Sequence, residues 1–152
     1  IQALEAQLQL AVDYDLPVSF HIRDGALDQP SVWDDFWPIF DNFHELSGVL
    51  HSFTDTRDNL EKGFSRNLYV GLNGISTFTK VQAQQELFAT IPLDRLLVET
   101  DAPFLTPKPF RGKINKPEYV ELVAKYWAEK RNIDFNVLSE ATVRNTKQLF
   151  GI

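Results

Sequence analysis

The sequence predicts an α/β fold in which parallel strands are covered by helices. Short apolar runs alternate with longer segments whose apolar residues recur at helical spacing, and polar residues follow each apolar run. Strands that are apolar on both faces are typical of a parallel sheet buried between helices. The predicted strands lie within residues 16–22, 48–53, 67–73 and 95–100.

Segments with helical spacing come before, between and after these runs. Ser31, Thr56 and Asp134 are predicted N-caps, and Pro117 suits a first helical position. The apolar positions are Ile1, Leu4, Leu8, Ala11 and Val12; Phe36, Ile39, Phe40 and Phe43; Leu60 and Phe64; Val81, Leu87, Phe88 and Ile91; and Val120, Val123, Ala124 and Trp127. The order is a helix, four βα units and a terminal helix, which fits half of a (β/α)₈ barrel or a small doubly wound sheet.

Composition indicates one globular domain over residues 1–152, with 43% hydrophobic and 24% charged residues. No apolar run approaches the roughly 18 residues needed to cross a bilayer, which excludes a membrane span. The chain has no cysteine, so any metal must be held by imidazole and carboxylate groups. The absence of disulfides also favours a cytoplasmic location.

Polar residues stand where the predicted strands end, namely His21 with Arg23, then His51, Asn73 and Asp101. Because the carboxyl ends of parallel strands meet at one edge of a sheet, these residues should converge. Imidazole and carboxylate together suit Zn²⁺ or Mn²⁺, and carboxylate with water suits Mg²⁺. His21, His51 and Asp101 are therefore the candidate metal ligands.

Structural roles are the alternative for each of these residues. A histidine that ends an apolar strand is commonly a hydrogen-bonded structural residue. Arg23 shares a face with His21, and Glu99 shares one with Asp101, so Arg23 and Glu99 can instead form a buried ion pair. His44 lies near a helix end and is predicted to be a surface residue.

Several segments in this order resemble the signatures of the TatD-like deoxyribonuclease family. They are residues 18–24, 48–53, 99–107 and 111–117, with further similarity at 73–78 and 144–151. The resemblance implies a TIM barrel of the amidohydrolase superfamily that binds one or two divalent metals (Mg, Mn or Zn) and hydrolyses phosphodiester bonds of DNA. It implies that His21 and His51 are ligands from the fifth and sixth strands. It also implies that Asp101, after the eighth, is a ligand and catalytic proton acceptor.

The family pattern also contains a His-x-His pair on the first strand and a glutamate on the fourth, and neither precedes His21. The resemblance thus covers the C-terminal half of a TIM barrel, about four βα units, with part of the metal site. We expect the isolated chain to be inactive or nearly so. We expect its open sheet edges and apolar interior to be covered by a missing N-terminal half, in preference to a second chain.

The charge distribution bears on the substrate. A net charge of −6 argues against broad binding of duplex DNA, which needs a basic surface. The loop after Asp101 nevertheless carries Lys108, Arg111, Lys113 and Lys116 before the next acidic residue. This basic loop can hold phosphates of single-stranded or frayed DNA beside Arg23 and Asn73, with Phe104 or Phe110 stacking on a base. Alternatively it is a solvated loop over the barrel mouth.

Two other functions remain open at this point. One is a metallohydrolase of the same fold that acts on a small ester, amide or nucleotide, and a substrate panel with a chelator control separates it from a nuclease. The other is a noncatalytic half-barrel that acts as an interaction module, a possibility that the missing ligands keep open.

Overall fold

A computed structural model describes residues 1–25 and 29–152 of the protein. At its centre is a parallel four-stranded sheet. Its strands are β1 (Val18–Phe20), β2 (Gly48–Leu50), β3 (Tyr69–Leu72) and β4 (Leu96–Val98). They pair in chain order, β1-β2-β3-β4. A doubly wound sheet reverses its winding at a switch point, whereas this order continues in one direction as in a barrel. The doubly wound alternative is therefore wrong for the described strands.

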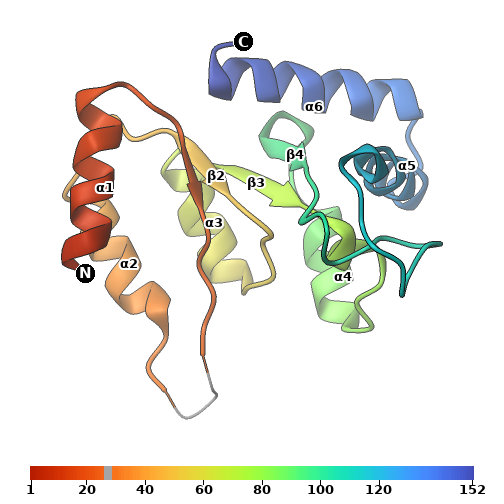
Figure 1. Cartoon of the computed structure of the whole chain (residues 1–152), viewed down its shortest axis with the longest axis horizontal. Coiled ribbons are helices and arrows are strands. Elements are labelled where there is room, and N and C mark those ends of the chain that lie inside the picture. Colours follow the sequence, from red (N-terminus) through yellow and green to blue (C-terminus); the bar gives the residue numbers. More distant parts are fainter. Residues whose placement is uncertain (26–28) are drawn as a thin grey trace.

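Helices surround this sheet (Figure 1), with α1 and α2 on the side of β1, and α5 and α6 on the side of β4. The helices are α1 (Gln2–Asp13), α2 (Val32–Phe40), α3 (Arg57–Ser65), α4 (Gln82–Ala89), α5 (Val120–Lys130) and α6 (Phe135–Phe150), with 3-10 turns η1 (Gly74–Thr77), η2 (Leu93–Arg95) and η3 (Pro117–Tyr119). The side chains of Ser31, Thr56 and Asp134 each accept a backbone N–H at a helix start, which confirms the predicted caps. None of the helices described is both long and apolar enough to span a bilayer.

The larger core lies between the helices and one face of the sheet. The register aligns Phe20 with Leu50, Leu50 with Val70, and Val70 with Leu96, so these side chains form a row across all the strands. Each is at most 4% exposed and belongs to the main apolar cluster. Side chains alternate between the two faces along a strand. The strand residues that alternate with this row therefore point to the opposite face, and the polar residues at the strand ends follow the same alternation.

The opposite face is also covered, in part by the last helix. Val49, Tyr69 and Leu97 are buried there and form a second cluster with Leu149 of α6. Asn145 of the same helix donates hydrogen bonds to the carbonyl oxygen atoms of residues 93 and 96, which fixes α6 against the amino end of β4. The prediction of an open apolar interior is therefore wrong for these strands, because the chain's own terminal helix packs against it.

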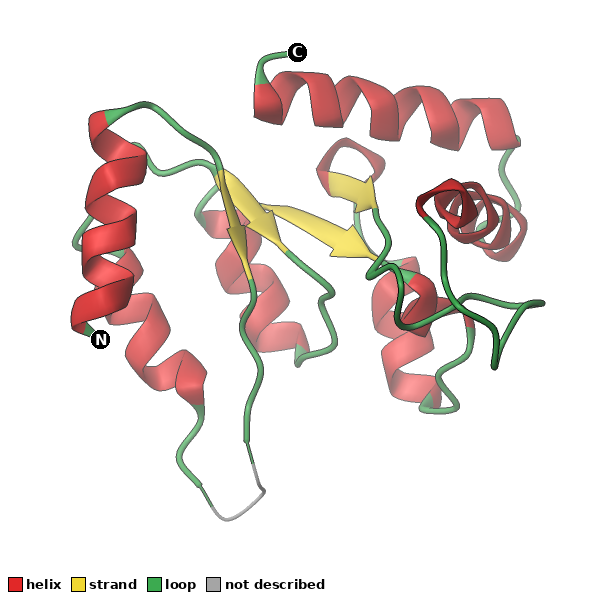
Figure 2. Cartoon of the chain, viewed as in Figure 1, coloured by secondary structure: helices red, strands yellow, loops and turns green. Residues whose placement is uncertain are grey.

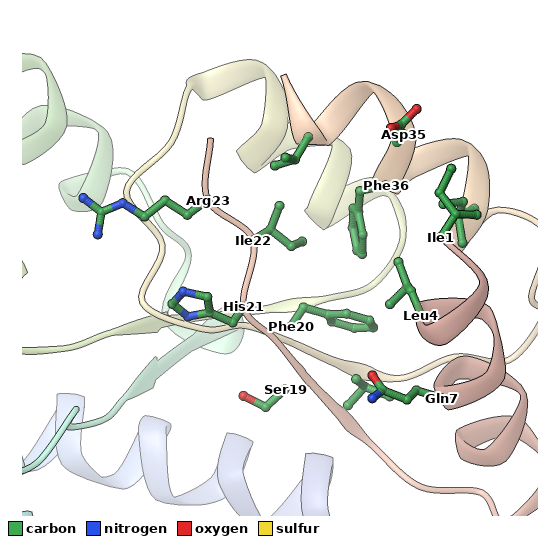
Figure 3. Close-up of a pocket in the computed structure, with 13 residues that line it drawn as sticks. Ile1, Leu4, Gln7, Ser19, Phe20, His21, Ile22, Arg23, Asp35 and Phe36 are labelled. Atoms are coloured by element: carbon green, nitrogen blue, oxygen red, sulfur yellow. The ribbon is translucent and has the colours of Figure 1, made fainter. Parts of the chain in front are cut away.

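The two outer strands each have a single strand neighbour within residues 1–25 and 29–152. A groove of about 500 Å³ runs beside β1 between α1 and α2. Figure 3 shows Leu4, Phe20 and Phe36 gathered on one side of this strand, while His21 and Arg23 extend to the other. The outer edge of β1 thus presents unpaired backbone groups next to apolar side chains.

A bidentate ion pair ties the ends of α2 and α3 together, and its strength should depend on pH. Arg66 donates to both carboxylate oxygens of Asp41, and the resulting hydrogen bonds lower the pKa of Asp41 below its ordinary 3.8. Because the pair is partly exposed, we expect Asp41→Asn to reduce the free energy of unfolding by at most about 1 kcal/mol at neutral pH. The pKa of Asp41 is lower in the folded state than in the unfolded state. The stability difference between the two proteins should therefore shrink as the pH falls below 3.8 and vanish as it falls through the folded-state pKa. Urea unfolding of both proteins measures it, and an equal difference in acid would contradict the assignment.

Candidate metal centre

The polar strand ends converge on the sheet face that also carries Val49 and Leu97. His51 follows Val49, and Glu99 follows Leu97, at the spacing of two that keeps side chains on one face. Backbone hydrogen bonds continue the ladder beyond the strands, since the N–H of His51 donates to the carbonyl of Phe20 at 2.9 Å and that of Glu99 to Leu72 at 3.1 Å. Figure 2 shows the loops that leave these strand ends. The site residues are thus held by regular sheet geometry.

His51 lies between two carboxylates. Its Nδ1 is 2.9 Å from Oε2 of Glu99, and its Nε2 is 3.3 Å from Oδ1 of Asp101. The hydrogen bond to Glu99 raises the pKa of His51 above its ordinary 6.5, and the negative charges of Glu99 and Asp101 add to the shift against partial burial. The two carboxylates therefore favour the protonated, positively charged form of the imidazole ring.

A carboxylate oxygen without a hydrogen-bond partner lies beside Nε2 of His51. Oδ1 of Asp101 is buried and has no hydrogen-bond partner among the described residues. When His51 is neutral and its Nδ1–H donates to Glu99, the lone pair of Nε2 faces this same oxygen. A lone pair and a carboxylate oxygen at this separation repel each other unless a proton or metal ion lies near both. Their donor chemistry suits Zn²⁺ or Mn²⁺.

His21 lies next to this pair, although it is less enclosed. Its ring centroid is 5.6 Å from that of His51, and its side chain is exposed at the rim of the groove beside β1. In the described part of the chain, no group of three or more His, Cys, Asp or Glu side chains is arranged to hold a metal ion. The structure therefore brings together one histidine–carboxylate pair with a second histidine nearby, and the set of three ligands stays a prediction.

Glu99 does not pair with Arg23, so the ion-pair alternative is wrong. The carboxylate of Glu99 instead accepts from the Nδ1–H of His51 and, through Oε1, from the backbone N–H of Ser52 at 2.5 Å. Arg23 is exposed and lines the groove beside β1. His44 is exposed, as predicted.

The side-chain amide of Asn73 forms its hydrogen bonds within the chain. Its side chain is completely buried, its oxygen accepts the N–H of Ile75 at 3.0 Å, and its amide donates to Oγ of Ser52 at 2.7 Å. Both ends of the amide are thus used to cap η1 and to hold the loop after β2. This arrangement favours a structural role over the predicted contact with substrate.

Several side chains of the basic loop after β4 contact other residues of the chain. The guanidinium of Arg111 lies 3.6 Å from the ring centroid of Phe78 and donates to the carbonyl of Thr106. The ammonium of Lys113 lies over the ring of Phe110, and that ring stacks on Tyr119 with centroids 5.0 Å apart. The ring of Phe110 is therefore already in contact with Tyr119 and Lys113.

Several side chains of the loop are exposed, and Lys108 and Phe104 are two that take no part in the ring contacts described above. Lys108 is exposed, and Phe104 is 72% exposed. These are the loop side chains best placed for an external partner.

Sequence reasoning missed the contribution of Glu99, Ser52 and Gly71 to this site. The spacing of two between Glu99 and Asp101 indicated a shared face, but it did not identify His51 as the partner. Gly71 lies directly under the carboxyl group of Glu99, where an added Cβ would be 2.5 Å from the carboxyl carbon. A strand glycine signals a close approach of another group, although it does not say which.

Comparisons with known proteins show what the chain is similar to. The family model described as TatD related DNase matches residues 1–151. The chain is 36% identical over 146 residues to an uncharacterised metal-dependent hydrolase, YabD, of Bacillus subtilis, covering 96% of this chain and 55% of that protein. It is also 36% identical over 160 residues to the 3'-5' ssDNA/RNA exonuclease TatD of Citrobacter rodentium, covering 99% of this chain and 57% of that protein.

A solved structure shows the same arrangement of elements. The TatD homologue YJJV of Escherichia coli superimposes with a TM-score of 0.82 at 28% identity, over 96% of this chain and 54% of that one. The chain thus spans little more than half the length of these relatives.

Proposed function

Because this chain belongs to the TatD-related DNase family, we propose that it is the metal-binding C-terminal half of a hydrolase that cleaves phosphodiester bonds in single-stranded DNA. The observation that carries the proposal is the buried, unpartnered Oδ1 of Asp101 beside Nε2 of His51. One or two divalent metals, with Mg, Mn or Zn as candidates, would be held by His51 and Asp101, with His21 as a further ligand.

The side chains of the site have separate roles in the proposed hydrolysis. A bound metal supplies Lewis acidity, which lowers the pKa of water and stabilises negative charge on a phosphate. Asp101 accepts the proton of the attacking water, because its Oδ1 has no other partner to satisfy. Glu99 keeps His51 in position through Nδ1. The remaining part of the site comes from outside these 152 residues.

The second part of the proposal is that an N-terminal half-barrel completes the site. The matches cover 55% and 57% of two relatives' lengths, which leaves room for further βα units. The unpaired edge of β1 and the apolar groove between α1 and α2 provide the surface for a neighbouring strand and helix. A second chain at the same surface is the competing occupant.

The substrate side of the proposal rests on charge and exposure. The exposed loop residues Lys108 and Phe104 offer one ammonium group and one aromatic face to a nucleic acid. A single strand can bring both its phosphates and its unstacked bases to such a surface. The net charge of −6 disfavours duplex DNA.

A nuclease assay tests the function directly. We expect no cleavage by the isolated chain, and metal-dependent shortening of single-stranded DNA when the N-terminal half of a full-length relative is joined ahead of it. Duplex DNA should be cut more slowly, and a chelator should stop the reaction. Reversal of charge at Lys108 should weaken binding and reduce its dependence on salt.

The rival functions predict different results in the same assay. Hydrolysis of small esters or nucleotides without shortening of DNA would favour the small-substrate metallohydrolase. Absence of any metal-dependent hydrolysis by the joined, folded protein would favour the noncatalytic half-barrel. A metal-dependent rate for the isolated chain that Asp101→Asn removes would contradict the proposed need for a second half.

A further inference from the structure

Both oxygens of the Glu99 carboxylate have a defined donor. Oε2 lies 2.9 Å from Nδ1 of His51, and Oε1 accepts the backbone N–H of Ser52 at 2.5 Å. Glu99 is only 19% exposed at its side chain. The carboxylate is therefore held at two points, and its orientation fixes the edge of the imidazole ring that it meets.

The surrounding backbone is shaped to admit this carboxylate. Gly71 leaves the space that the carboxyl group occupies, because a Cβ there would overlap it. Ser52 adopts a positive φ of 52°, an uncommon conformation for a residue with a side chain. The amide of Asn73 holds Oγ of Ser52, and Ser52 in turn directs its N–H at Glu99. Three strand ends thus cooperate to place one carboxylate.

From this arrangement we infer that Glu99 is a positioning residue that keeps the proton of neutral His51 on Nδ1, so that the lone pair of Nε2 faces Oδ1 of Asp101. The inference deepens the proposed metal centre and rests on it for its functional meaning. A histidine ligand whose other nitrogen donates to a carboxylate is fixed in both tautomer and orientation. Glu99 does not itself need to contact the metal.

Glutamine at position 99 would reverse the pattern without changing the shape. Its single carbonyl oxygen can accept the N–H of Ser52, and its amide N–H can then donate to Nδ1 of His51. The ring proton would move to Nε2 and donate to Asp101, whose Oδ1 would gain the partner that it lacks. The tautomer that results places a proton where the metal ion would bind.

Nitrogen-15 NMR of the imidazole rings in the metal-free 152-residue chain tests this inference. At a pH where His51 is neutral, we expect the Nδ1–H tautomer in the wild type and the Nε2–H tautomer in Glu99→Gln. Titration with Zn²⁺ alone should show affinity about 10- to 100-fold lower in the variant. Gly71→Ala, which pushes the carboxylate away by a different route, should lower the affinity in the same way.

Control measurements keep the outcomes distinct. Glu129→Gln, an exposed position on α5, should change neither the tautomer nor the affinity, and circular dichroism should show that Glu99→Gln remains folded. An unchanged tautomer and unchanged Zn²⁺ affinity in Glu99→Gln would overturn the inference. A reversed tautomer with no Zn²⁺ binding by the wild type would support the role of Glu99 while overturning the proposed metal centre.

Discussion

Asp101→Asn should lower the rate of DNA cleavage by about 10²- to 10⁴-fold in the joined, full-length form of the protein, the range typical of a lost general base. Asparagine has the same shape as aspartate but cannot accept the proton, and it loses one charged metal ligand. The initial rate on single-stranded DNA at saturating metal measures the effect. The extent to which added metal restores the rate separates weakened binding from lost proton transfer.

The same substitution should leave the folded state of the isolated chain as stable as before or more stable. Oδ1 of Asp101 is buried without a hydrogen-bond partner, which is costly in a folded protein. An asparagine amide can donate to Nε2 of His51, which lies 3.3 Å from that oxygen. Opposite effects on activity and on stability are the pattern expected of a functional residue.

Asp94→Asn provides the matched control. Asp94 lies in η2 at the other end of the same strand and is exposed, so its replacement should alter neither cleavage nor stability. A large loss of stability in Asp101→Asn, with activity reduced only in proportion to the unfolded fraction, would show that Asp101 has a structural role.

Local signals predicted most of the fold. Ser31, Thr56 and Asp134 were found from short-range patterns because capping involves residues only two or three positions apart. The strands were located by apolar runs, although each observed strand is shorter than its run, and some of the ladder hydrogen bonds continue into the flanking residues. Strand order could not be found this way, since the same βα pattern fits two windings.

The parts of the site that sequence could not predict depend on contacts between distant residues. Glu99 meets Ser52 across 47 positions, and no periodicity links them. Leu149 of α6 joins the cluster on the inner sheet face, although the helical pattern gave no sign of the partner for this residue. The Arg23–Glu99 pair was a reasonable alternative by charge, but both oxygens of the Glu99 carboxylate have donors in the segment that follows β2.

Trp127→Ala should cost about 3–5 kcal/mol of unfolding free energy, the range found for large buried aromatic residues. Trp127 is 1% exposed, and its ring meets Phe88 edge-on with centroids 5.8 Å apart. Because domains of ordinary size are stable by about 5–15 kcal/mol, this loss would remove a large share of the total. Urea unfolding followed by circular dichroism measures it.

Two further variants separate the packing of Trp127 from its hydrogen bond. The indole N–H donates to Oγ of Ser76 at 2.8 Å, and this hydroxyl donates to the carbonyl of Asn73, so the tryptophan also supports the loop that holds the site. Trp127→Phe should cost less than the alanine variant, since it keeps an aromatic ring but leaves Ser76 without its donor. Phe104→Ala, which truncates an aromatic residue that is 72% exposed, should change stability by less than about 0.5 kcal/mol. Equal losses in the buried and exposed alanine variants would contradict the assignment of Trp127 to the core.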